Sequence, residues 1–242
     1  MNRIVTMLLC TYMLVGAGCA RSKQRTTVYL VDVSKSVSPK GFRLEFQAAQ
    51  DLVDGLHRGD RLIVIPITGD AVNDTSGRIL YFDAPATRQP YDYDLISFRK
   101  CARQRLEAMQ ADFSSDPADR TDVFGALRIA AGELNRHSST RLVAAPELDI
   151  ASDFVEDDEQ YRFTFKSPAD GIELAKRVKR QDGFSPPSNL RVRMIELPSI
   201  EKVKASRQGQ GSVRAFWLEY FAPLDRRWTP IDSMLESGSA TD

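Results

Sequence analysis

The chain has 242 residues, enough for a sizeable core, and its 42% hydrophobic and 27% charged residues are ordinary for a globular protein. The 33 Lys and Arg balance the 33 Asp and Glu, so the composition gives no sign of a nucleic-acid-binding surface. Two histidines, His57 and His137, leave little room for a zinc site or a histidine-based catalytic triad.

The N-terminus has the pattern of an export signal. A short basic start is followed by an apolar run at 4–15, too short to span a bilayer comfortably, and then by small residues before Cys19. This resembles a bacterial lipoprotein signal, in which the cysteine is lipidated, although Gly16 stands where Leu is usual. A plain cleaved signal and an uncleaved anchor are the alternatives. We expect a signal at 1–18, a tether at 19–25, a lipid on Cys19, and a place on a membrane of the bacterial cell envelope, facing the periplasm or the surface.

The three cysteines suggest export without disulfides. If Cys10 leaves with the signal and Cys19 carries the lipid, Cys101 remains as a single thiol. Ala102, Leu106 and Met109 follow it at helical spacing, so we expect Cys101 to be buried and inert.

After the tether, strand-like and helix-like segments alternate. Apolar β-branched runs are typical of buried parallel strands, and Ser38-Pro39 is a typical helix start, with Ser as the N-cap and Pro at the first position. In this half we expect strands at 26–32, 61–67 and 78–82, the last at a sheet edge, and helices at 39–56, 95–109 and from 121 onward.

The second half continues the alternation with one irregularity. A core strand is expected within 141–152, but Pro146 interrupts it, so we expect a bulge, bend or split there. We further expect a short strand or ordered loop at 161–165, a helix starting at Ser167-Pro168, a strand at 189–197, a loop at 202–212 turning at 209–211, and a helix at 213–221 with an aromatic core face.

This order predicts an α/β fold with a mainly parallel central sheet flanked by helices on both faces. We see no internal repeat and no long linker, so we expect one domain at 26–224. The remainder, 225–242, is expected to be a C-terminal tail, small and polar from Leu235.

Polar oxygen-bearing residues collect where the predicted strands end. Alternate side chains of an extended chain share a face, so Asp32, Ser34 and Ser36 can converge after the first strand. Asp153 follows another short apolar segment that is predicted to be a strand, and Thr121 stands where a loop leads into a helix. Ligands of open α/β sheets bind at the carboxyl ends of strands, and carboxylate and hydroxyl oxygens suit a hard cation such as Mg²⁺, Mn²⁺ or Ca²⁺.

These residues resemble the metal-ion-dependent adhesion site of von Willebrand factor A (VWA) domains, over about 26–224 of this chain. The matching motifs are Asp32-x-Ser34-x-Ser36, Thr121 in Arg-Thr-Asp-Val-Phe-Gly, and Asp153 in Ile-Ala-Ser-Asp. The resemblance implies a single Rossmann-like VWA domain holding an octahedral divalent cation. It implies that Ser34 and Ser36 bind the ion directly, Thr121 directly or through water, and Asp32 and Asp153 largely through water. An acidic residue of a partner protein would take the open position.

Each residue also has a plain structural reading. Asp32 could bond to loop amides, the serines could be turn residues, and Thr121 or Asp122 could be a helix N-cap. Gly often follows the last aspartate in the family, whereas this chain has Phe154, which predicts a bulkier, more acidic rim. The acidic run at 156–159 is read as a solvated loop, with a second cation site as the alternative.

The leading hypothesis is a membrane-anchored, non-catalytic module that binds a partner protein through a divalent cation. A metal-dependent phosphatase-like hydrolase is an alternative, but such enzymes pair two carboxylates as Asp-x-Asp, and here the second position is Ser34. A structural envelope lipoprotein with a vestigial metal site is the other alternative.

Overall fold

The computed structural model describes residues 24–75, 77–87, 92–137, 144–156, 163, 165, 167–199 and 207–231. Six strands form one sheet in the order β3-β2-β1-β4-β5-β6. The strands are β1 (Thr26–Asp32), β2 (Arg61–Ile67), β3 (Leu80–Asp83), β4 (Glu147–Ser152), β5 (Arg191–Glu196) and β6 (Asp225–Pro230). Every neighbouring pair is parallel except β2 and β3. The predicted Rossmann-like, mainly parallel architecture is therefore confirmed, with β3 as the predicted edge strand.

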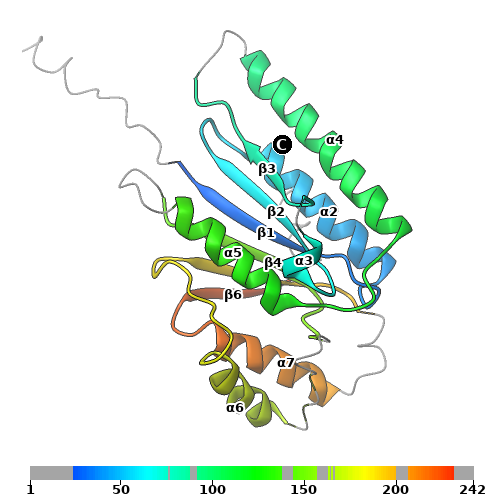
Figure 1. Cartoon of the computed structure of the whole chain (residues 1–242), viewed down its shortest axis with the longest axis vertical. Coiled ribbons are helices and arrows are strands. Elements are labelled where there is room, and N and C mark those ends of the chain that lie inside the picture. The colour runs from blue at the N-terminus through cyan, green and yellow to red at the C-terminus, as the bar shows by residue number, and fades with distance from the viewer. Residues whose placement is uncertain are drawn as a thin grey trace, which may run out of the picture.

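Helices cover both faces of this sheet (Figure 1). They are α2 (Pro39–Asp54), α3 (Ala71–Asp74), α4 (Tyr93–Ser115), α5 (Val123–His137), α6 (Pro168–Val178) and α7 (Arg207–Tyr220). α2 and α4 lie on one face, whereas α5, α6 and α7 lie on the other. Two predicted N-caps are confirmed: Ser38 Oγ accepts from Gly41 N at 3.1 Å, and Ser167 Oγ accepts from Asp170 N at 3.3 Å.

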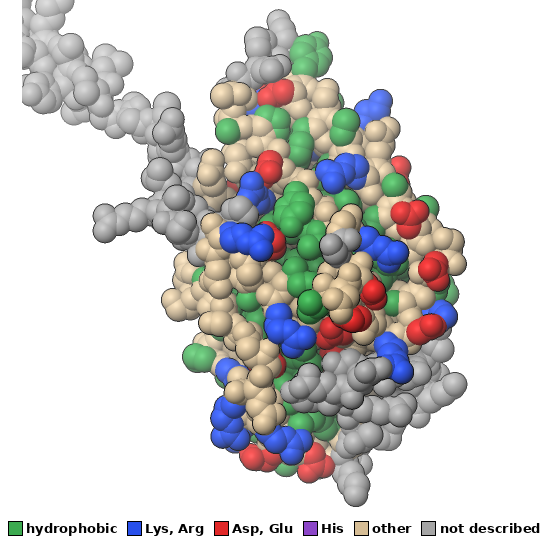
Figure 2. All heavy atoms as spheres, in the orientation of Figure 1, with side chains coloured by type: hydrophobic (Ala, Val, Ile, Leu, Met, Phe, Trp, Pro, Cys, Tyr) green, Lys and Arg blue, Asp and Glu red, His purple; other side chains and the backbone are tan. Residues whose placement is uncertain are grey.

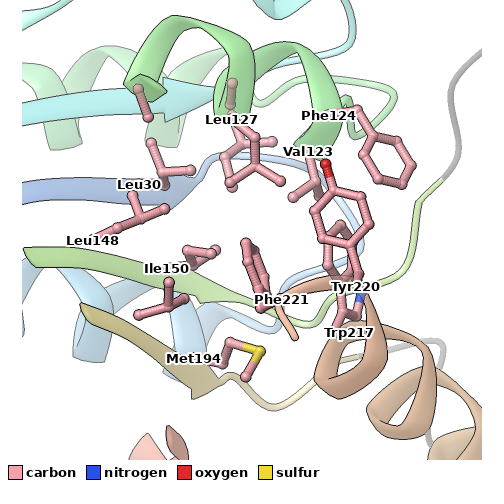
Figure 3. Close-up of a cluster of buried hydrophobic side chains, with 14 of the residues drawn as sticks. Leu30, Val123, Phe124, Leu127, Leu148, Ile150, Met194, Trp217, Tyr220 and Phe221 are labelled. Atoms are coloured by element: carbon pink, nitrogen blue, oxygen red, sulfur yellow. The ribbon is translucent and has the colours of Figure 1, made fainter. Parts of the chain in front are cut away.

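Alternation along the strands divides the core into two layers. Leu30 and Ile150 point to the α5–α7 face, where the aromatic side of α7 packs as predicted (Figure 3). Tyr29 and Val31 point to the opposite layer under α2 and α4. β1 is buried along its whole length because it lies between β2 and β4 under both layers. On the outside, basic and acidic side chains are interspersed over the face seen in Figure 2.

Three sequence-based expectations about local structure are wrong. β4 starts after Pro146, which leaves the proline outside the strand, so no bulge or split is needed; Pro146 O accepts from Arg191 N at 3.0 Å. Positions 209–211 lie inside α7 because that helix packs closely on α6, where a Cβ on Gly171 would lie 2.4 Å from Ser212 O. Cys101 is exposed because the buried stripe of α4 runs through Ala102 and Leu106, one residue around the helix.

One further strand was not predicted. β6 lies in the stretch assigned from the sequence to the C-terminal tail, yet it pairs with β5 from Arg191↔Asp225 to Glu196↔Pro230. Its pattern of alternating exposure is that of an edge strand, which carries too weak an apolar signal to be read from sequence.

Some expectations fall outside the described residues: the signal at 1–18, the lipidation site Cys19, the final tail from 232, and the acidic positions 157–159. Within the described ranges, no helix combines the length and the apolar character needed to cross a membrane.

Candidate metal centre

The two predicted aspartates lie side by side at the carboxyl edge of the sheet. Asp32 is the last residue of β1, and Asp153 directly follows β4. β1 and β4 are paired parallel neighbours, with Val31 opposite Ala151, so their ends meet at the same edge. Both side chains are completely buried. The structure therefore brings together the two carboxylates that the sequence placed 121 positions apart.

The loop carrying Ser34 and Ser36 is held from both sides. On one side, Lys35 N donates to Ala118 O and Ala118 N donates to Val33 O, each at 2.9 Å. On the other side, Ser199 Oγ donates to Ser36 O at 3.2 Å. The hydroxyl oxygens of Ser34 and Ser36 are 2.9 Å apart, within hydrogen-bonding distance. The two predicted hydroxyl ligands are thus together, on a loop whose backbone is fixed.

Asp32 is oriented by two hydrogen bonds. Its Oδ1 accepts from Ser34 N at 3.1 Å, and its Oδ2 accepts from Ser152 Oγ at 2.6 Å. The predicted role as a strand-end acid bonding to a loop amide is therefore present, and it orients the carboxylate within the Asp-x-Ser-x-Ser loop. Ser152 was not predicted as a site residue, although it stands next to Asp153 in the sequence.

The two carboxylate oxygens of Asp153 differ in whether they accept a hydrogen bond from the described residues. Oδ1 accepts from Val155 N at 3.0 Å, whereas the buried Oδ2 has no hydrogen-bond partner among the described residues. Such an orphan acceptor is costly in a protein interior, so it points to a missing donor or cation.

The residue after Asp153 holds an unusual backbone conformation. Phe154 has φ of 61°, in the left-handed region that favours glycine. Its ring is buried against Trp228, with centroids 4.8 Å apart, and its carbonyl accepts from Trp217 Nε1 at 3.1 Å. Aromatic packing therefore holds a non-glycine residue in the conformation that turns the chain after Asp153.

A third buried carboxylate lies behind the aspartates. Glu45, on α2, accepts at Oε2 from Asp32 N at 2.9 Å, and its Oε1 has no hydrogen-bond partner in the described part of the chain. The sequence contained a signal for it, because position 45 falls on the apolar face defined by Phe42, Phe46 and Ala49. An acid at such a core position is unusual and indicates a polar task.

The electrostatics of this cluster favour a cation. Burial, and then the neighbouring charge of Asp153, raise the pKa of Asp32 to about 7, against the lowering effect of its bonds from Ser152 and Ser34. Burial, followed by the charges of Asp32 and Asp153, raises the pKa of Glu45 well above its usual value. Among the described residues, no Lys, Arg or His side chain forms an ion pair with these three acids.

Thr121 lies on the segment next to the Ser34 loop and is not needed as a helix cap. Asp122 is the capping residue: its Oδ1 accepts from Gly125 N at 2.6 Å and its Oδ2 from Ala71 N at 3.2 Å. Asp122 N donates to Thr68 O at 2.8 Å, which places the segment beside the end of β2. Thr121 is 2% exposed and follows shortly after Ala118, which forms an isolated parallel β-bridge with Ser34.

The expectation of a bulkier and more acidic rim is wrong at two positions. Phe154 and Glu156 are both fully buried. Glu156 Oε2 accepts from Val123 N at 3.0 Å at the start of α5, where a helix N-terminus stabilises negative charge. Glu156 therefore belongs to the core side of the turn and not to a solvated acidic loop.

Taken together, the donor set fits Mg²⁺ or a similar hard cation. Such ions are commonly held by one or two carboxylates, with other oxygen ligands filling the shell. Asp32, Asp153, Ser34 and Ser36 bring two carboxylates and two hydroxyls to one edge of the sheet, and Thr121 carries a third hydroxyl on the adjoining segment. Within the described ranges, no group of three or more His, Cys, Asp and Glu side chains is arranged to hold a metal, so the hydroxyls are essential to this assignment.

Comparison with known proteins gives likeness in structure only. No protein-family model and no curated sequence matches the chain. The manganese-loaded TRAP protein of Plasmodium vivax is similar over 89% of this chain and 72% of its own, with 14% identity and a TM-score of 0.48. A von Willebrand factor type A structure from Catenulispora acidiphila is similar over 82% of this chain and 42% of its own, with 15% identity and a TM-score of 0.41. These likenesses concern the fold.

Proposed function

We propose that this chain is a lipid-anchored protein of the bacterial cell envelope that binds a partner protein through a divalent cation, without catalysing a reaction. Ser34, Ser36 and Thr121 would hold the ion together with Asp32 and Asp153. The ion would be Mg²⁺, with Mn²⁺ and Ca²⁺ as alternatives. When bound, it would supply a positive centre that attracts a carboxylate of the partner, because its direct ligands would be neutral hydroxyls and the two aspartates would act largely through water.

One observation carries this proposal: Asp32 and Asp153 are buried next to each other, and Asp153 Oδ2 has no hydrogen-bond partner among the described residues. Two neighbouring carboxylates without a positive partner are destabilising in a protein interior. A bound cation removes that penalty, which gives a physical reason for retaining the pair.

A binding role is favoured over hydrolysis by the way the acids are held. Both oxygens of Asp32 already accept hydrogen bonds, and the second motif position is Ser34, so no free carboxylate pair is presented to a substrate. His57, a histidine that could carry a proton, lies beside Asp60 just before β2 and therefore at the opposite edge of the sheet.

Isothermal titration of the full chain in detergent with Mg²⁺ and Mn²⁺ tests the metal site. We expect saturable binding by the wild type and its loss in Asp32→Ala and Asp153→Asn. Asp153→Asn is the sharper variant, because it removes a repulsive charge and should remain folded, as checked by circular dichroism. Glu107→Ala, which removes an exposed acid of α4, is the matched control and should bind like the wild type. Absence of binding by the wild type would refute the proposal.

The partner is sought separately by affinity capture from envelope extract, with Mg²⁺ and then with a chelator. We expect a protein retained only with Mg²⁺ and not retained by Asp153→Asn. Hydrolysis of generic phosphate esters by the wild type, lost in Asp32→Ala, would favour the phosphatase alternative.

The anchor has its own test. Cys19→Ser should abolish labelling by radioactive palmitate and move the chain out of the membrane fraction. Equal labelling of the variant would contradict lipidation at Cys19 and leave the metal site unaffected.

A further inference from the structure

A groove opens next to the candidate metal centre, between the first turns of α2 and the last turns of α4. It has a volume of about 520 Å³ and begins at Ser34, one of the proposed ligands. Its apolar lining comes from Val37, Pro39, Phe42, Phe113 and Pro117. This volume lies within the range of about 300–1,000 Å³ that is typical of ligand pockets. The groove is thus continuous with the site and large enough to receive side chains of a partner.

The groove is apolar but has a positive border. Its lining includes Lys35 and Arg43 and no Asp or Glu. Arg43 is exposed, and α2 begins at Pro39 on the same border, so the partial positive charge of the helix N-terminus adds to the charge of Arg43. Lys35 is paired with Asp119, whereas Arg43 has no ion pair among the described residues. Charge complementarity therefore selects an acidic occupant.

We propose that this α2–α4 groove binds an extended segment of a partner protein in which one or two apolar side chains stand beside acidic residues. The apolar side chains would lie against Phe42 and Phe113, and an acidic neighbour would face Arg43. Because the groove starts at Ser34, the same segment would reach the metal ion, so the proposal rests on the proposed function and deepens it. In this proposal the groove discriminates between partner segments, whereas the metal ion would bind a carboxylate of any partner.

Selection from a random twelve-residue peptide library displayed on phage tests this inference without knowing the partner. The full chain, in detergent with Mg²⁺, is the bait. Enriched peptides are expected to combine Leu, Ile or Phe with a nearby Asp or Glu. Enrichment of basic peptides, or no enrichment above beads without protein, would overturn the proposal.

Synthetic copies of enriched peptides are then measured by fluorescence polarisation. Arg43→Glu should weaken binding at least tenfold, and Phe42→Ser should do the same by removing the apolar wall. Lys100→Glu makes the same charge reversal on an exposed residue in the first half of α4, away from the groove, and should bind like the wild type. Equal affinity for wild type and Arg43→Glu would refute the groove, as would a dimer of this chain that requires Phe42.

Failure of the groove can be told apart from failure of the metal site. Arg43→Glu should keep its Mg²⁺ binding in isothermal titration, since Arg43 is not a proposed ligand. If peptides bind equally well with a chelator and in Asp153→Asn, the groove stands and metal-dependent binding fails. If Mg²⁺ binds but the substitutions at Arg43 and Phe42 leave peptide affinity unchanged, the metal site is supported and the groove proposal is refuted.

Discussion

Ser152 Oγ donates a hydrogen bond of 2.6 Å to Asp32 Oδ2, across 120 positions of sequence. The same oxygen accepts from Phe154 N at 2.8 Å. One buried hydroxyl therefore fixes the orientation of the first aspartate and the turn that carries the second, Asp153. The parallel pairing of β1 and β4 makes this possible, because it brings the two strand ends together.

Ser152→Ala should weaken both stability and metal binding. Loss of the hydroxyl leaves Phe154 N without its acceptor and removes one donor from Asp32, at a cost of about 1–3 kcal/mol in the free energy of unfolding. The Mg²⁺ dissociation constant should rise several-fold, since the pKa of Asp32 would increase further. Urea denaturation and isothermal titration measure the two effects. Ser114→Ala, an exposed serine of α4, should change stability by less than about 0.5 kcal/mol.

The stability of the metal-free protein should fall as pH rises from about 4 to about 7. Burial and Asp153 raise the pKa of Asp32 from an ordinary 3.8 to about 7. In that window Asp32 holds a proton in the folded protein that it releases in the unfolded chain, so this group alone lowers the free energy of unfolding by up to about 1.4 kcal/mol per pH unit, and the raised pKa of Glu45 acts in the same direction. Urea denaturation across the window measures this slope.

Two comparisons identify Asp32 and the ion as the source of that slope. Saturating Mg²⁺ should flatten it, because the ion takes the place of the proton and stabilises the ionised site increasingly as pH rises. Asp153→Asn should reduce the slope without abolishing it, because it removes the second cause of the raised pKa and leaves the first, burial, in place. A wild-type slope that neither change alters would contradict the assignment.

At position 154, glycine should be tolerated better than alanine. Phe154→Ala removes a fully buried ring, which costs about 3–5 kcal/mol. Phe154→Gly loses the same ring but relieves the positive φ, so it should be more stable than Phe154→Ala by about 1 kcal/mol. The usual order is the reverse: at Ala108, exposed within α4, replacement by Gly should cost about 0.5–1 kcal/mol. Thermal or urea unfolding of the four proteins gives the ranking.

Two glycines of α5 should respond in opposite directions to alanine. A Cβ on Gly125 would lie 2.0 Å from Asp122 Oδ2, so Gly125→Ala should displace the cap beside Thr121 and lower both stability and Mg²⁺ affinity. A Cβ on Gly132 meets no atom within 4 Å, so Gly132→Ala should stabilise by about 0.5–1 kcal/mol through helix propensity. Equal effects of the two changes would show that the cap does not depend on this close approach.

Much of the fold was readable because it depends on local signals. The apolar run of β1, the Ser-Pro starts of α2 and α6, and the aromatic face of α7 each predict an element from neighbouring residues alone. Two of the expectations that were wrong concern elements that depend on contacts between distant segments. The helical state of Gly209 to Gly211 depends on packing against α6, and the strand at Asp225 depends on the edge offered by β5.

The same division holds for the site. The sequence by itself determined which oxygen-bearing residues stand at strand ends and loop entries, since strand alternation and helix starts are properties of short segments: Asp32, Ser34, Ser36, Thr121 and Asp153. Only the tertiary structure decided that Ser152 and Glu45 support them, that Glu156 turns inward, and that an apolar groove adjoins Ser34. Burial and contact between distant segments determine these features, because the cost of a buried charge depends on what surrounds it in space.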